Sequence, residues 1–143
     1  MSKRVKAGEG TLFAIPRTDG KFILGQVLQE WMPGAICIAV FDCLVTPGIP
    51  PNLSSVAGPF SLPSVSKSEI TKGHWPVMGD SDLLTDVRRA PHYEFEKSGF
   101  LGASWHSGAI IEKLVDAYYG LDTWEPYPGR VGFLKSLLLP AHH

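Results

Sequence analysis

Hydrophobic residues recur most regularly near the N-terminus, where the pattern predicts three consecutive β-strands. Each of the three segments is rich in apolar and β-branched residues, and tight-turn residues, Pro16 to Gly20 and then Pro33-Gly34, separate them. The predicted strands are Thr11–Ile15, Phe22–Glu30 and Ala35–Phe41. The third has no polar residue at either alternation, which is typical of a strand buried on both faces, in the middle of a sheet or inside a small barrel.

The middle of the chain contains no charged residue from Leu44 to Ser66, and it is interrupted by several prolines. Proline cannot donate a hydrogen bond within a sheet, so part of this stretch must be loop. Its apolar residues are too frequent for a free linker. We therefore expect a packed loop over about 44–57, followed by an edge strand near Gly58–Val65.

The pattern after residue 80 is mixed. Asp80-Ser81-Asp82 offers an N-cap and first-turn acids for a short helix through Arg88. His92 to Glu96 alternates like an extended segment, and Phe100–Trp105 reads as a further strand. Apolar residues at helical spacing favour a helix over Ala109–Tyr119, and a strand stays open as the alternative.

Near the C-terminus, apolar residues at positions 131, 134 and 138 predict a last short helix, weakened by Gly129 and Gly132. These elements together predict an α+β, mainly β fold: an antiparallel sheet or a small open SH3-like barrel with one to three short helices. The 143 residues, 44% of them hydrophobic, are enough for one globular domain over 1–143. Its parts are a β-meander at about 8–42, the packed loop at about 44–57, and C-terminal strand and helices at about 58–138.

The charge balance argues against several classes of partner. Thirteen Lys and Arg against fourteen Asp and Glu give a net charge of −1, which is a poor basis for general nucleic-acid binding. The basic residues Lys3, Arg4 and Lys6, and the pair Arg88-Arg89, lack an accompanying aromatic platform. No stretch is apolar for long enough to span a bilayer, and the N-terminal region does not resemble a secretion signal. We expect a cytoplasmic protein.

No catalytic set, metal site or cofactor motif is visible in the sequence. Gly102-Ala-Ser104-Trp-His106 has histidine where a nucleophile elbow needs its second glycine. His74, His92 and His106 are too widely spaced for a local metal motif. Cys37 lies in an apolar run, so it and Cys43 are expected to be reduced, structural thiols. We therefore predict no catalytic residues, no metal and no cofactor.

Aromatic residues are the remaining candidates for function. The chain has four tryptophans, and large aromatic side chains are frequent anchors of protein interfaces as well as of cores. Trp31 lies beside Met32 in a predicted hairpin turn, and we expect it to be the most exposed of the four.

Three short motifs resemble the immunity protein 26 family of bacterial polymorphic toxin systems. The first is Lys6-Ala-Gly8 with Leu12-Phe-Ala-Ile-Pro16, Gly20-Lys21 and Gly25-Gln-Val27-Leu28. The second is Thr71-Lys-Gly-His-Trp75-Pro76-Val-Met-Gly79, and the third is Gly120-Leu-Asp-Thr-Trp124. The matching positions are Phe13, Pro16, Gly25, Val27, Trp75, Pro76, Gly79 and Trp124. Turn geometry and core packing account for them without a ligand site.

The resemblance implies a mainly β, cytoplasmic immunity protein that binds a cognate toxin and occludes its active surface. It supplies no catalytic residues. The candidate partner-binding residues are Trp31, Trp75, His74, Asp80 and Asp82. With Glu94 and Glu96, the two aspartates could form an acidic patch that steers the protein toward a basic toxin.

Two other classes of function remain open from the sequence. One is a small enzyme or ligand-binding barrel in which His74, His92 or His106 acts with a carboxylate. It requires at least two of these histidines to meet at one pocket. The other is a peptide-binding module, which requires an exposed, shallow patch of Trp and Tyr side chains. The sequence does not determine the oligomeric state.

Overall fold

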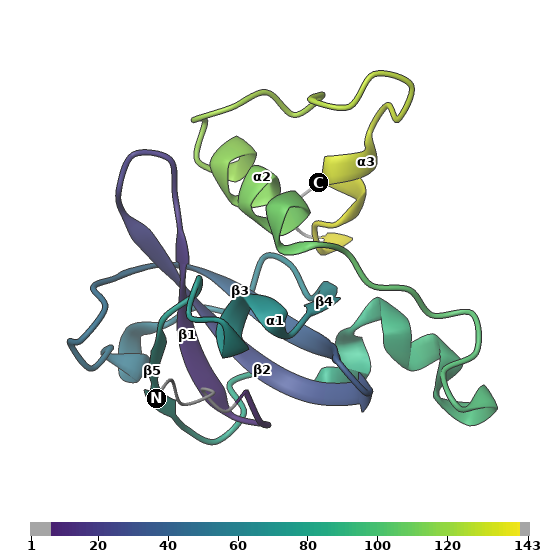
Figure 1. Ribbon diagram of the computed structural model, residues 1–143, viewed down its shortest axis with the longest axis horizontal. Helices are drawn as coiled ribbons and strands as arrows, with labels where there is room; N and C mark the ends of the chain where they lie inside the picture. Colours follow the sequence, from purple (N-terminus) through teal and green to yellow (C-terminus); the bar gives the residue numbers. More distant parts are fainter. Residues whose placement is uncertain (1–6, 141–143) are drawn as a thin grey trace.

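The computed structural model describes residues 7–140, so the basic residues Lys3, Arg4 and Lys6 lie outside the described range. Five strands form one antiparallel sheet in the order β4-β3-β2-β1-β5 (Figure 1). The strands are β1 (Thr11–Pro16), β2 (Phe22–Met32), β3 (Ala35–Val45), β4 (Ser64–Ser66) and β5 (Val77–Asp80). The predicted meander is confirmed, and the sheet is open, with β4 and β5 at its two edges.

Short helices lie between the later strands and after the last one. They are η1 (Leu53–Ser55), α1 (Ser68–Thr71), η2 (Val87–Arg89), η3 (Pro91–Ser98), α2 (Gly108–Tyr118) and α3 (Phe133–Ser136). The helix predicted over Ala109–Tyr119 is confirmed as α2. The last predicted helix is the single turn α3, which buries Leu134 but leaves Val131 outside the helix and 89% exposed.

Both faces of the sheet are buried, because alternate residues of each long strand point to opposite sides. On one face, Ile36, Ile38 and Val40 of β3 join a core that includes residues of α2 and α3. On the other face, Cys37 and Phe41 of the same strand pack in a second core. The prediction that this strand is buried on both faces is therefore confirmed.

The segment predicted to be a helix from Asp80 to Arg88 is not one, and only its end, η2, is helical. The reason is a buried glutamine of β2. The Gln26 side chain donates to Ser81 Oγ and the Asp82 carbonyl, both at 3.0 Å, and accepts from Leu84 N–H at 2.8 Å. The backbone groups that a helix would use are therefore held by the sheet.

The next two predictions are also wrong. His92 to Glu96 is not extended but lies within the 3-10 helix η3, which has Pro91 at its start and left-handed Gly99 at its end. The expected strand Phe100–Trp105 is irregular, because positive φ angles at Gly99, Phe100 and Gly102 interrupt an extended chain. The expected edge strand near Gly58–Val65 is reduced to the three residues of β4.

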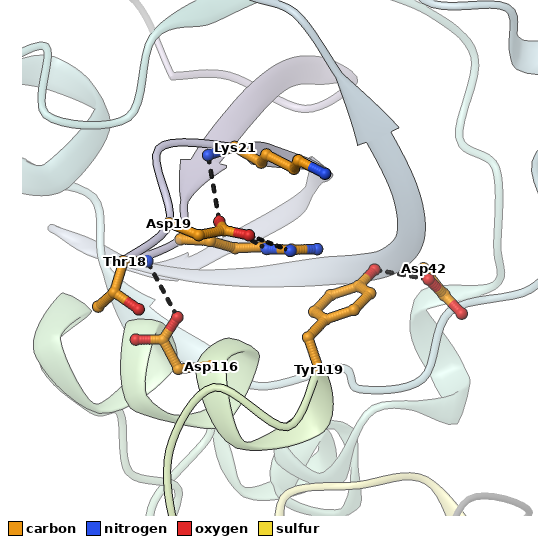
Figure 2. A network of polar contacts seen from close by, with 7 residues as sticks. Thr18, Asp19, Lys21, Asp42, Asp116 and Tyr119 are labelled. Carbon is orange, nitrogen blue, oxygen red and sulfur yellow. Dashed lines mark hydrogen bonds and ion pairs between the residues drawn. The ribbon is translucent and has the colours of Figure 1, made fainter.

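Helix α2 is fastened to the β1–β2 loop and to β3 by polar contacts (Figure 2). The buried Asp116 carboxylate accepts from Thr18 N–H at 3.1 Å. The Tyr119 hydroxyl donates to Asp42 Oδ1 at 2.6 Å, and the Arg17 guanidinium lies 4.4 Å from the centre of the Tyr119 ring. Burial, with the neighbouring Asp42, raises the pKa of Tyr119. These contacts fix the cover of one sheet face.

A close contact between β1 and β2 explains three of the motif residues. Phe13 pairs directly with Gly25, and its ring is stacked on Trp75 with 5.6 Å between centroids. A Cβ atom at position 25 would lie 2.5 Å from the Phe13 ring. Because the backbone at Gly25 does not have a positive φ, the requirement for glycine here is one of space alone.

We predict that Gly25→Ala lowers the free energy of unfolding by about 1–3 kcal/mol, because the methyl group overpacks the Phe13–Trp75 stack. Gly58→Ala is the matched control: nothing lies within 4 Å of its Cβ position, so no loss is expected. Chemical denaturation of both variants measures the difference. Equal stability of the two would show that the ring moves aside without cost.

Candidate functional site

Two tryptophans expected at the partner surface lie inside the protein. Trp31 is only 7% exposed, and its indole N–H donates to Ser64 Oγ at 2.9 Å. The expectation that it is the most exposed tryptophan is wrong, because Trp31 lies within β2 and the rings of His92, Phe100 and Trp105 pack around its indole. Trp75 is fully buried, and its indole donates to a Glu112 carboxylate oxygen at 2.9 Å.

The polar candidates are exposed but do not form one site. His74 lies with Nδ1 3.2 Å from a Glu69 carboxylate oxygen. Asp80 and Asp82 are exposed at the end of β5 and just beyond it. The acidic residues Glu94 and Glu96 belong to η3. In Figure 1, η3 is the green helix at the right of the view, whereas β5 lies at the left. The structure therefore does not bring the four predicted acids into one patch.

The structure instead gathers aromatic rings around Trp31. Its ring centre is 5.6 Å from His92, 5.7 Å from Phe100 and 5.9 Å from Trp105. Trp105 is 47% exposed, and nearby in the chain Leu101 is 75% exposed. We call this group the aromatic face: Trp31, His92, Phe100, Leu101 and Trp105. Its outer members are a large aromatic and a large aliphatic side chain in contact with water.

A cavity of about 330 Å³ lies beside the aromatic face. Its lining residues come from the β4 region, η3, the 102–106 segment and the end of α3: Leu62, Pro63, Ser64, Pro91, His92, Phe95, Gly102, Ala103, Ser104, His106, Ser136 and Leu137. Ser104 and His106, the chain neighbours of Trp105, both belong to it. The backbone of His106 is held next to β4 by hydrogen bonds with Ser64 and Ser66.

Both histidines at this cavity are held in the neutral form. His92 is buried, and its Nε2 donates to Gln29 Oε1 at 2.7 Å. Burial lowers the pKa of His92 to about 4. Its Nδ1 is the only buried side-chain nitrogen or oxygen in residues 7–140 without a hydrogen-bond partner. Burial, and then the positive charge of Arg130, lower the pKa of His106.

The backbone next to these histidines is strained. Phe100 has φ 66°, the only positive φ of a non-glycine residue in the described part of the chain. A bulky residue in the left-handed region costs about 1 kcal/mol or more. The ring of Phe100 is stacked on His92 with 5.6 Å between centroids, so the left-handed backbone and the unpaired nitrogen lie next to each other.

The cavity does not have the composition of a hydrolytic or metal site. No carboxylate lines it, and residues 7–140 contain no group of three His, Cys, Asp or Glu side chains that could hold a metal ion. His92 and His106 do meet at one pocket, as the enzyme alternative requires, but His74 is not there and the carboxylate partner is missing. Burial raises the pKa of the Cys37 thiol to about 12, so it is a poor nucleophile.

A second apolar surface lies at the far end of β3. Leu44 is 57% exposed and Ile49 is 60% exposed, and shallow hollows surround them. None of the residues described at this surface is an exposed aromatic, a buried polar side chain without a hydrogen-bond partner, or a non-glycine residue with a positive φ. It therefore ranks below the aromatic face as a candidate, and it serves below as a control.

Comparison with known proteins gives one match. The family model Immunity protein 26 matches residues 8–104, more than half of the chain, and the chain belongs to this family. The match covers β1–β5 and ends within the aromatic face, so the Gly120–Trp124 motif lies beyond it. No curated protein and no solved structure matches the chain. None of the helices described in residues 7–140 is long and apolar enough to cross a membrane.

The residues shared with the family pattern have places in the fold. Val27 is fully buried in the first core, and Trp124 packs against that core. The Pro76 carbonyl accepts from Ala14 N–H at 2.9 Å, at the start of β5. Gly79 has φ 121° within β5, and Pro16 ends β1.

We predict that acid destabilises the protein through His92. Its pKa is about 4 in the folded chain and about 6.5 in the unfolded chain, so only the unfolded chain binds the proton between these values. Stability is therefore fully present above pH 6.5 and falls as the pH drops to 4, by at most about 3 kcal/mol from this group.

The measurement is chemical denaturation between pH 7 and pH 4, for the natural chain and for His92→Gln. The amide can still bond to Gln29 but does not titrate, so the variant should show a shallower loss. The slope that remains comes from His106 and the carboxylates. Parallel curves for the two proteins would mean that the His92 ring is hydrated in solution.

Proposed function

We propose that this protein is an immunity protein that binds a cognate bacterial toxin and occludes the toxin's active surface. Membership of the immunity protein 26 family supports the class of function. The proposed contact surface is the aromatic face, and the carrying observation is Trp105, an indole that remains 47% exposed on top of a buried aromatic cluster.

The energetics of binding support this choice of surface. Trp is the side chain most enriched among interface residues that dominate affinity, and such residues work best when their neighbours hold them rigidly. Trp105 packs edge-on against Trp31, which is itself fixed by its hydrogen bond to Ser64. A partner that covers Trp105 and Leu101 therefore removes their exposed apolar surface from water.

No chemical step by this chain is part of the proposal. The cavity holds neutral imidazoles and no carboxylate, and the Cys37 thiol is buried away from it. Inhibition by covering needs no catalytic group. An exposed aromatic is also what a peptide-binding module requires. The proposal differs from that alternative in its partner, a folded toxin whose activity is blocked.

We predict that Trp105→Ala weakens toxin binding about tenfold or more, because truncation of an interface anchor costs about 1–2 kcal/mol or more. Leu101→Ala should weaken it less. The toxin encoded by the neighbouring gene is the ligand, binding is measured by calorimetry, and protection is measured as growth during co-expression. Leu101→Ala should melt like the natural chain, because Leu101 is 75% exposed. Trp105→Ala loses the ring contact with Trp31, so it should melt slightly lower but remain folded.

Leu44→Ala is the matched control, because it also removes an exposed leucine but lies on the second apolar surface. It should bind and protect like the natural chain. Loss of protection with Leu44→Ala and full protection with Trp105→Ala would move the interface to the end of β3. If the natural chain itself does not protect the cell, the immunity function is contradicted.

A further inference from the structure

We propose that the cavity beside the aromatic face receives one neutral aromatic side chain of the toxin that carries a hydrogen-bonding atom, a tyrosine or a tryptophan. This inference rests on the proposed function and specifies the partner group that the site takes.

The shape and lining of the cavity set the size and polarity of the occupant. A volume of about 330 Å³ is ample for a single large side chain, and the walls include Leu62, Phe95 and Leu137. Burial of an aromatic ring against such walls is favourable, because it removes apolar area from water.

The charge of the occupant follows from the same lining. No Lys, Arg, Asp or Glu side chain lines the cavity. A charged group moved there would lose its hydration without an opposite charge to compensate, so Lys, Arg, Asp and Glu of a toxin are disfavoured. The two histidines do not change this, because burial keeps both imidazoles neutral near pH 7.

The cavity nevertheless offers neutral polar groups that are free to bond. Within residues 7–140, neither the Ser104 hydroxyl nor the His106 ring makes a side-chain hydrogen bond. The His106 ring does contact the ring of Phe133, with 5.5 Å between centroids. The Ser136 hydroxyl donates to the Phe133 carbonyl and retains its capacity to accept. A phenol O–H or an indole N–H can therefore find a partner there, whereas leucine or phenylalanine cannot use it.

A side chain of the bound protein is favoured over a free metabolite because of where the cavity lies. Ser104 and His106 line it on either side of Trp105 in the chain, and Leu101 adjoins Gly102, which also lines it. A protein that covers Trp105 and Leu101 is thus brought to the rim of the cavity. Tyrosine and tryptophan are also the residues most often found as anchors in such pockets.

The first test uses small probes on the protein alone. Amide NMR spectra are recorded with p-cresol and with indole, which carry the Tyr and Trp side-chain groups, and with toluene and n-butylamine as controls. We expect p-cresol or indole to shift Ser104, His106 and Ser136 saturably, toluene to bind several-fold more weakly, and n-butylamine to leave these signals unchanged. No saturable shift with p-cresol and indole, or equal binding of n-butylamine, overturns the inference.

The second test fills the cavity. In Ser104→Leu, a larger side chain occupies the lining, and we expect it to abolish the probe shifts and to weaken toxin binding at least tenfold. Ala57→Leu adds the same side chain at an exposed position outside the lining, and should change neither. Unchanged melting temperatures of both variants would show that folding is intact. Should Ser104→Leu unfold, Ser136→Leu fills the cavity from the α3 side.

The outcomes separate this inference from the proposed function. Loss of toxin binding in Trp105→Ala, with full binding in Ser104→Leu, overturns the cavity inference and leaves the immunity function standing. If the probes bind but Ser104→Leu leaves toxin affinity unchanged, then a toxin side chain does not occupy the cavity, and the inference is overturned. Failure of the natural chain to bind the toxin contradicts the immunity function, while the probe titration still tests the cavity itself.

Discussion

The rest of this structure depends on a sheet whose central strands are buried on both faces. In β3, Ile38 points into one core and Cys37 into the other, and neither face of the sheet can be left to water. The chain after the meander must therefore supply two covers. The first is regular: α2 lies along one face and is held by the contacts of Asp116 and Tyr119. The second is irregular, and it is the part of the molecule in which the candidate site lies.

The irregular cover is attached to the sheet by side chains of β2. Gln26 binds the backbone of the 81–84 segment, Gln29 binds His92, and Trp31 stacks on the same imidazole. Two costs accompany this arrangement, the unpaired Nδ1 of His92 and the left-handed Phe100. They lie where the cover turns back toward β4, and the same turn leaves the aromatic face with an exposed indole. A surface anchor thus rests on a rigid core.

The residues that identify the family and the residues proposed to bind the toxin are different sets. Phe13, Gly25 and Trp75 interlock between the strands, and Trp75 has no exposed surface with which to touch a partner. Such positions carry the fold. Trp105 lies just beyond the family match, in a stretch where the backbone is irregular. The other members of the aromatic face lie within the matched residues 8–104.

The sequence by itself determined the three strands of the meander and their turns, and it favoured helix α2 over a strand. Each of these depends on a repeat pattern and turn residues within a dozen positions. It also carried the family resemblance. Only the tertiary structure decided that Trp31 is buried while Trp105 is exposed, that His92 and His106 share a cavity, and that Asp80 does not begin a helix. These outcomes depend on partners far away in the chain: Gln26 captures the N–H of Leu84 across 58 positions, and Trp31 meets Ser64 across 33. The local sequence pattern indicates the secondary structure that a segment prefers by itself. The exposure of a side chain depends instead on which distant segment packs over it.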